Sequence, residues 1–343
     1  MNIGIDKTYV TNAIEQLMSI LGISEEMPVS RIMTPTNPAE TKLLIESIAR
    51  YLRLPVRIHV INVPDDYRPP DTSSFGGNAF HSSDMVITDS YGKATASIVA
   101  QVQIPSYLPM FGSPKMEGFP INVMVSVDAV SNSYAFVSIM AHELTHIVLY
   151  SIQHTEKNNE VYTDLAAMLL GFSTIMKHAR SNKRIGYLND DLFWCAYSRI
   201  SELLGERTQA KCDLLSIAHN SEIMLLQFEK LFIRFTRLMQ YVDNSRLSKK
   251  FKHADRIVEF HQTDYTKKYS TQIQKTKQEL LQIRKYCTEL LHYTPTAYDG
   301  IHKLSQQAIT VQSNLKANLS LLQDDTKILT TYVGRFRLWL NKL

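Results

Sequence analysis

The sequence predicts an α+β domain over about residues 1–205 and an α-helical bundle or coiled coil over about residues 206–343. Two observations indicate this division. The first part mixes short β-like runs with segments of helical apolar spacing, whereas the second part has almost no glycine or proline and long runs of helical spacing. The chain has 343 residues, which is long for one domain and typical of two structural units.

The elements of the first part follow from the period of their apolar residues. Runs rich in β-branched residues predict strands, and longer runs with apolar residues three or four positions apart predict helices. The predicted strands are 56–62, 95–104 and 121–127, and the predicted helices are 7–21, 40–53, 134–151, 158–179 and 190–204.

Long apolar seams run through the second part, within residues 207–245, 254–293 and 300–341. Such spacing keeps one face of each helix against a partner, as in coiled coils and long bundles. Breaks at 243–253 and at Pro295–Gly300 would let the chain reverse. We therefore predict a helical hairpin bundle, while one long coil paired between two chains gives the same pattern.

The composition is that of a globular protein with an uneven charge. Three cysteines, an odd number without a CxxC pair, argue against a disulfide framework and against a cysteine-based metal site.

Residues 1–206 carry 15 Lys and Arg against 21 Asp and Glu, whereas residues 207–343 carry 22 Lys and Arg against 12 Asp and Glu. No nucleic-acid motif accompanies the basic residues of the second part, among them Lys249, Lys250, Lys252, Arg256, Lys267 and Lys268. We interpret them as a solvated helix face, so a nucleic-acid partner is not expected.

The chain has no feature of a targeting or membrane segment. Its first residues are polar where a signal peptide would be apolar, and no run of eighteen apolar residues occurs. We therefore expect a cytoplasmic protein that does not bind a membrane.

The pattern that carries chemistry is AHELTH at residues 141–146. On a helix, His142 and His146 are one turn apart on the same face, so both imidazoles can reach one metal ion. Glu143 lies beside them and can accept a proton from a water that the metal activates. A pair of satisfied core histidines is the plain alternative. The flanking residues are apolar, however, and two histidines and a glutamate are costly there without a partner.

A suitable third ligand follows in NEVYTD, residues 159–164. A catalytic zinc site uses three protein ligands and keeps one position for water. Glu160 and Asp164 are four residues apart, on one face of the next predicted helix. Glu160 can therefore bind the metal while Asp164 accepts the outer N–H of a ligand histidine. We expect one zinc ion per chain, held by His142, His146 and Glu160.

The two motifs AHELTH and NExxTD resemble those of the gluzincin clan of zinc metallopeptidases, and their residues are most similar to the motifs of thermolysin. The resemblance covers about residues 120–175, and thirteen residues separate His146 from Glu160, as in compact members of the clan. It implies a zincin-like metallopeptidase fold for the first domain. The roles it implies are His142, His146 and Glu160 as zinc ligands, Glu143 as catalytic base and Asp164 as the residue that orients a ligand histidine.

The resemblance also implies a side chain that stabilises the oxyanion. Tyr187, in the segment RIGYLND after the second site helix, is the candidate for this catalytic role, with Tyr162 and His154 as alternatives. Packing of an aromatic ring at a turn is the favoured alternative for Tyr187, and a solvated loop position is the favoured alternative for His154. The metzincin pattern is excluded, because Leu149 and Ile152 stand where that pattern has glycine and histidine.

The expected function is hydrolysis of peptide bonds in a cytosolic protein or peptide by zinc-activated water. The strand 121–127 is a candidate edge strand along which a peptide substrate would pair. A non-catalytic zinc-binding sensor or scaffold with a helical interaction module is the alternative from another class, and a nucleic-acid-associated protease is a second one. The C-terminal helices are the expected surface for self-association or for a partner protein.

Overall fold

The computed structural model describes residues 5–64, 79–82, 86–88, 94–96, 100–126, 132–180, 186–244 and 265–340. These residues are mostly helical, with a small mixed sheet in the first half and long helices in the C-terminal region. The chain divides into two compact units. The first unit comprises Met1–Gly205 and His292–Pro295, and the second comprises Glu206–Leu291 and Thr296–Leu343.

A four-stranded mixed sheet in the order β2-β7-β6-β3 forms one layer of the first unit. β2 (Arg57–Val63) is parallel to β7 (Pro120–Ser126), and β6 (Ala100–Ile104) is antiparallel to both β7 and β3 (Ala79–Ser82). β7 therefore lies between two strands, and the prediction that 121–127 forms an edge strand is wrong. The buried run at the end of β7, covered on both faces, is typical of an interior strand.

Two short ladders complete the strands described in the first unit. β4 (Val86–Thr88) pairs with β5 (Ala94–Ala96), and β1 (Ile23–Ser24) pairs with β8 (His292–Tyr293), both antiparallel. The predicted strand 95–104 is thus divided between β5 and β6, and residues 97–99 lie outside the described residues.

The first three helices begin at side-chain caps. The side chains of Asp6, Asn37 and Asn132 accept the backbone N–H three residues later, at 2.8, 3.0 and 3.1 Å. Such caps satisfy N–H groups that have no partner within the helix. The helices are α1 (Lys7–Leu21), α2 (Pro38–Tyr51) and α3 (Ser133–Ser151). Their bounds confirm the predicted helices 7–21, 40–53 and 134–151 to within two residues.

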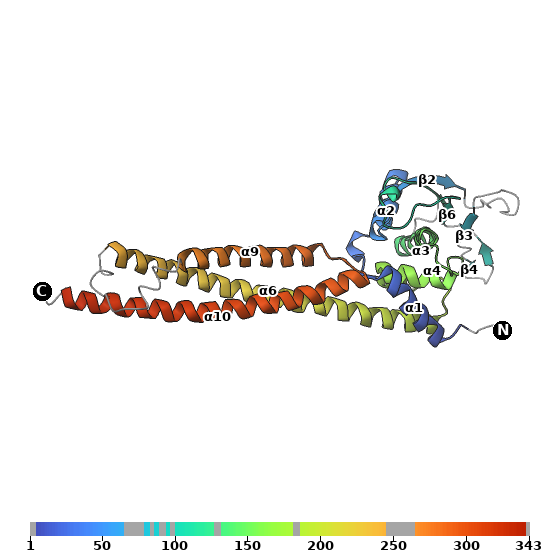
Figure 1. Ribbon diagram of the computed structural model, residues 1–343. Helices are drawn as coiled ribbons and strands as arrows, with labels where there is room; N and C mark the ends of the chain where they lie inside the picture. The colour runs from blue at the N-terminus through green and yellow to red at the C-terminus, as the bar shows by residue number, and fades with distance from the viewer. Residues whose placement is uncertain are drawn as a thin grey trace. The chain divides into compact units, whose positions relative to one another are not determined.

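α3 is the central helix of the first unit. It contacts α2, β6, α4 (Glu160–Ala167) and α5 (Ser173–Arg180), and Figure 1 shows it between the strands and the helices α1 and α4. Every residue from Phe136 to Leu149 is buried. The helix therefore lacks the one-sided apolar stripe of a surface helix, and any polar side chain in its middle must find its partners inside the protein.

The predicted helix 158–179 is interrupted in the structure. A π-helical segment, Met168–Phe172, separates α4 from α5, and Gly171 within it has a φ of 99°. The carbonyl of Gly171 accepts the N–H of Met27 at 2.8 Å. Glu26 accepts the hydroxyl of Ser173 and, at 3.2 Å, the N–H of Thr174. These contacts hold the interruption at Gly171 and give α5 its own N-terminal cap.

Long helices form the second unit. α6 spans Asp190–Asn244, α9 spans Tyr265–Glu289 and α10 spans Pro295–Leu340 (Figure 1). α6 passes through residues 204–207 without a break, so the prediction of two separate helices there is wrong. The sequence offers no breaker at this point, since Gly205 alone is tolerated within a helix.

Two ion pairs show the relative direction of α9 and α6. Lys277 Nζ lies 2.5 Å from Glu229 Oε1, and Arg284 Nε lies 2.6 Å from Glu222 Oε1, so the two helices run antiparallel. Much of the predicted seams lies in the buried interior of the unit, whereas Ile217, Met224, Leu231 and Leu238 of the α6 seam are only half-buried. The largest buried side chains there include Phe228, Phe235, Tyr269, Ile283, Leu315 and Leu322.

The break predicted at Pro295–Gly300 lies earlier in the structure, between the end of α9 at Glu289 and Pro295. α10 begins at Pro295, where the missing N–H costs nothing because the first helical residue has no intrahelical acceptor. Gly300 lies inside the helix, and a Cβ there would come within 2.5 Å of the Tyr286 hydroxyl. Gly300 thus permits close packing on α9 and does not end a helix. The predicted break 243–253 follows the end of α6 at Asn244 but otherwise lies outside the described residues.

Among the residues described, no helix has both the length and the apolar character needed to cross a membrane. Lys267 and Lys268 are exposed on α9, as expected for a solvated face. The basic residues between 249 and 256 lie outside the described ranges.

We predict that Gly171→Ala destabilises the protein by about 2 kcal/mol or more, the cost of holding a side chain at a φ of 99° against a close neighbour. An added Cβ would lie 2.5 Å from the carbonyl oxygen of Glu25. Gly205→Ala in α6 is the matched control, because no atom lies within 4 Å of its Cβ position. That change should stabilise the helix by about 0.5–1 kcal/mol. Thermal and urea unfolding measure both, and equal effects would contradict the assigned role of Gly171.

Candidate metal site

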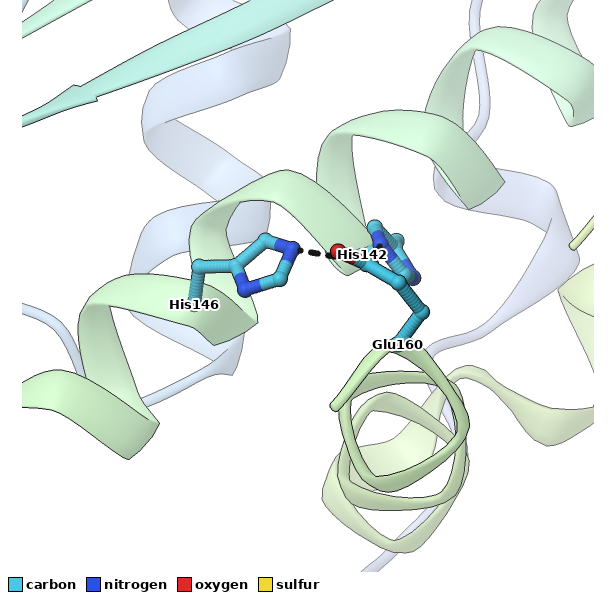
Figure 2. A group of neighbouring side chains, drawn as sticks. All are labelled: His142, His146 and Glu160. Atoms are coloured by element: carbon cyan, nitrogen blue, oxygen red, sulfur yellow. Dashed lines mark hydrogen bonds and ion pairs between the residues drawn. The ribbon is translucent and has the colours of Figure 1, made fainter. Parts of the chain in front are cut away.

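The candidate site lies where the middle of α3 meets the start of α4. Figure 2 shows the side chains of His142, His146 and Glu160 turned toward one another. Their ligand atoms all lie within 4.8 Å of one another. Nε2 of His142 and Nε2 of His146 lie 3.0 and 3.3 Å from the same oxygen, Oε2 of Glu160. The structure thus brings together the three residues predicted as ligands.

Asn159 fixes the start of α4 and thereby the position of Glu160. Its Oδ1 accepts the N–H of Val161 at 3.1 Å, and its Nδ2 donates to Glu156 Oε2 and to the Tyr9 hydroxyl, both at 2.9 Å. Glu160 is the first residue of the helix, where the helix dipole favours a negative charge. One side chain therefore caps the helix and anchors the loop before it.

The outer nitrogens of both histidines have partners of their own. Nδ1 of His142 lies 2.8 Å from Asp164 Oδ1, and Nδ1 of His146 lies 3.4 Å from the Thr163 hydroxyl. A carboxylate only accepts hydrogen bonds, so Nδ1 of His142 carries the hydrogen. In the neutral ring, Nε2 then presents a lone pair to the carboxylate of Glu160. This arrangement is unfavourable unless a proton or a cation joins them.

The pKa shifts of the three residues follow from these contacts. Burial lowers the pKa of His142, but hydrogen bonds to Asp164 and Glu160 outweigh burial and raise this pKa to about 10. Burial lowers the pKa of His146, and the neighbouring His142 adds to the effect. Burial also opposes the charge of Glu160, yet the two histidines hold its pKa well below the ordinary value. A metal cation that binds both rings and the carboxylate would replace the shared proton.

Glu143 follows His142 directly in α3 and is not one of the three converging side chains. It is fully buried, and its Oε2 accepts the backbone N–H of Val102 in β6 at 3.2 Å. Its charge also contributes to the raised pKa of His142. The sheet backbone therefore helps to orient a carboxylate whose charge acts on a candidate ligand.

Tyr187 closes one side of the site. Its ring stacks on the ring of His142, with centroids 5.4 Å apart, and its backbone N–H donates to Asp164 Oδ2 at 2.7 Å. Asp164 therefore links His142 to this turn. Gly186 has a φ of 90°, and a Cβ there would lie 2.8 Å from Asp164 Oδ2. The side chain of Tyr187 is 41% exposed, and its role toward an oxyanion stays a prediction.

The two alternatives to Tyr187 lie deeper in the fold. His154 is only 8% exposed, and its Nδ1 accepts the N–H of Glu156 at 3.1 Å, so its interpretation as a solvated loop residue is wrong. Its ring rests on Tyr162, whose hydroxyl donates to Gln16 in α1 at 2.9 Å. Burial lowers the pKa of His154. His154 does not belong to the converging group.

Four contacts that support the site were not predicted from the sequence. They are made by Thr163, Val102, Gly186 and Asn159. Thr163 carries a usable signal, because it lies three residues after Glu160 on the same side of the helix. Asn159 precedes the helix as a typical cap residue. The contact of Val102 uses a backbone N–H and leaves no mark in the sequence.

No protein-family model, curated protein or solved structure matches this chain. The function of the site therefore rests on its own geometry and chemistry. The buried group of His142, His146 and Glu160 can hold a metal ion. Two imidazole nitrogens and a carboxylate oxygen are donors that suit zinc and its first-row neighbours.

We predict that the purified protein binds about one metal ion per chain and that His142→Ala or His146→Ala abolishes binding, because each removes one of three ligands. Glu160→Ala should lose most of the metal. Elemental analysis after dialysis measures the content. His59→Ala, an exposed histidine on β2, is the control and should keep full occupancy. Retention of the metal by Glu160→Ala together with its loss in His154→Ala would overturn the third ligand.

We predict that Gly186→Ala weakens metal affinity by about 10–100-fold, the range for residues that orient a ligand histidine. The added Cβ displaces the carboxylate of Asp164, so Asp164→Ala should have a similar effect and the double variant little more. Gly112→Ala is the matched control, since its φ of 75° is also positive but no atom lies near its Cβ position. Competition with a chelator gives the affinities. An equal loss in Gly112→Ala would assign the effect to backbone strain.

Proposed function

We propose that the chain is a zinc metallopeptidase of the gluzincin kind, whose first unit, zincin-like in fold, hydrolyses peptide bonds of a protein or peptide. The observation that carries this proposal is the convergence of two Nε2 atoms on Glu160 Oε2. The charge of the buried Glu143, the residue after His142, also acts on the His142 ring. Catalytic zinc sites use two histidines and a carboxylate and keep a further position for water.

The residues around the metal position have complementary roles in the proposed reaction. Bound zinc would polarise the peptide carbonyl and make a bound water more acidic. Glu143 takes the proton of the attacking water and passes it to the leaving amine. Asp164 holds the ring of His142 in the orientation that frees Nε2 for binding. Tyr187 is the proposed donor to the oxyanion, because it lies beside the same ring.

The openness of the site favours catalysis over a sensor or scaffold. Structural zinc sites are closed by four protein ligands, whereas three candidate ligands converge among the residues that the structure describes. The side chain of Glu160 is 30% exposed, and a pocket of about 590 Å³ borders it. A substrate can therefore approach the metal position from the side of α4.

We predict that Glu143→Gln keeps the zinc content and the fold while hydrolysis falls by about 10²–10⁴-fold, the usual contribution of a general base. The amide oxygen of the glutamine can still accept the N–H of Val102, so the local packing is preserved. Mass spectrometry of new N-termini in a proteome digest measures the activity. Glu117→Gln, an exposed glutamate, is the control and should match the wild type. A wild-type protein that binds zinc and cleaves nothing would favour the non-catalytic sensor or scaffold.

A further inference from the structure

The pocket beside α4 belongs to the surroundings of the metal position. Its volume is about 590 Å³, and Glu160 and Tyr187 form part of its wall. Glu156 and Asn158 line the pocket from the loop before α4, and Val161 lines it from α4 itself. Ile5 completes the described wall. A substrate held at the metal would therefore place a neighbouring side chain in this pocket.

The lining of the pocket carries negative charge. Two carboxylates, Glu156 and Glu160, face it, and no Lys or Arg is among the lining residues that the structure describes. A metal bound at Glu160 would compensate that carboxylate, so Glu156 is the remaining charge among the described lining residues. Lys157 follows directly in sequence, but its Nζ lies over the ring of Tyr150, 5.0 Å from the ring centroid.

The carboxylate of Glu156 is held in place before any ligand arrives. Its Oε2 accepts from Asn159 Nδ2 at 2.9 Å, and its backbone N–H donates to His154 Nδ1 at 3.1 Å. Asn159 also starts the helix that carries Glu160, so the two carboxylates share one support. A group fixed in this way loses little freedom on binding, which favours selective recognition.

The remaining walls suit a long side chain with an apolar stem. Ile5, Val161 and the ring of Tyr187 offer apolar surface beside the carboxylate. Lysine and arginine lay their methylene groups along such surface while the charged end meets a carboxylate. Acidic side chains would meet repulsion, and short apolar ones would leave Glu156 without a partner.

We propose that Glu156 makes this pocket select a lysine or arginine of the substrate close to the bond that is cut. This inference rests on the proposed function, because the pocket is defined by its place beside the metal position. Glu156 is thus a specificity-determining residue, and the substrate class is basic peptides.

The test compares peptides that differ at one residue near a cleavable bond, with Arg, Lys, Leu or Glu at each position in turn. For the zinc-loaded wild type, kcat/KM should be about five- to tenfold higher for Arg or Lys than for Leu at one position, as for a half-exposed ion pair with some apolar contact. Glu156→Gln should remove most of this ratio, and Glu156→Lys should reverse it in favour of Glu. Glu117→Gln is the control and should keep the wild-type ratio.

A binding measurement separates failure of this inference from failure of the proposed function. Peptide hydroxamates that carry Arg, Leu or Glu are titrated into zinc-loaded wild type and Glu156→Gln by calorimetry. Equal affinities in the wild type, or a preference that Glu156→Gln retains, overturn the role of Glu156. If the Arg hydroxamate binds best but no peptide is cleaved, the peptidase proposal fails while the selective pocket stands.

Discussion

The burial of α3 on every side is the constraint on which the site depends. A helix with solvent on one face can point its histidines at water, but residues 136–149 have no such face. Both imidazoles and the carboxylate of Glu143 must therefore be satisfied by protein atoms or by a bound ion. Because the helix is part of the core, its polar side chains have no water to bind, and they depend on Glu160 and on other protein groups as partners.

The partners of these polar residues come from segments far apart in the chain. Val102 reaches Glu143 from the sheet, while Asp164 and Thr163 reach the histidines from α4. The turn at Gly186 supports Asp164 from its other side. Asp164 and Thr163 each hold the outer nitrogen of a histidine whose other nitrogen faces Glu160. The geometry of the three ligands therefore depends on the packing of segments that are far apart in the chain.

Much of the site could be predicted from the sequence because its core is local. Helical geometry places His142 and His146 on one face, and it does the same for Glu160 and Asp164, so two short motifs define four positions. The sheet order could not be predicted in this way. A strand such as 121–127 has the same pattern at an edge or in the middle, and only its neighbours decide. The interruption of the predicted helix 158–179 at Gly171 was missed because the carbonyl of Glu25, remote in sequence, is what excludes a side chain there.

In the second part of the chain, some helix features are determined by nearby residues and others by contacts with residues far away in the sequence. The start of α10 at Pro295 is a local effect of proline, and the missed boundary resulted from treating Pro295 and Gly300 together as a break. The continuity of α6 follows from the absence of any breaker near Gly205. Gly300, by contrast, is explained by Tyr286 on another helix, a contact that has no local signature.

The contact between Glu143 and Val102 ties the chemistry of the site to the sheet. No side chain of β6 is among the predicted site residues, and the N–H that binds Glu143 belongs to the backbone. Any residue except proline supplies that group, so the position of the strand matters and the identity of its side chain does not. The motif region 120–175 thus contains the ligands and the candidate base but not the atom that orients the base. A helix with the same motif and no strand at this distance would bind a metal yet leave Glu143 free to turn away. The placement of β6 against α3 is therefore part of the proposed catalytic apparatus, although no sequence motif records it.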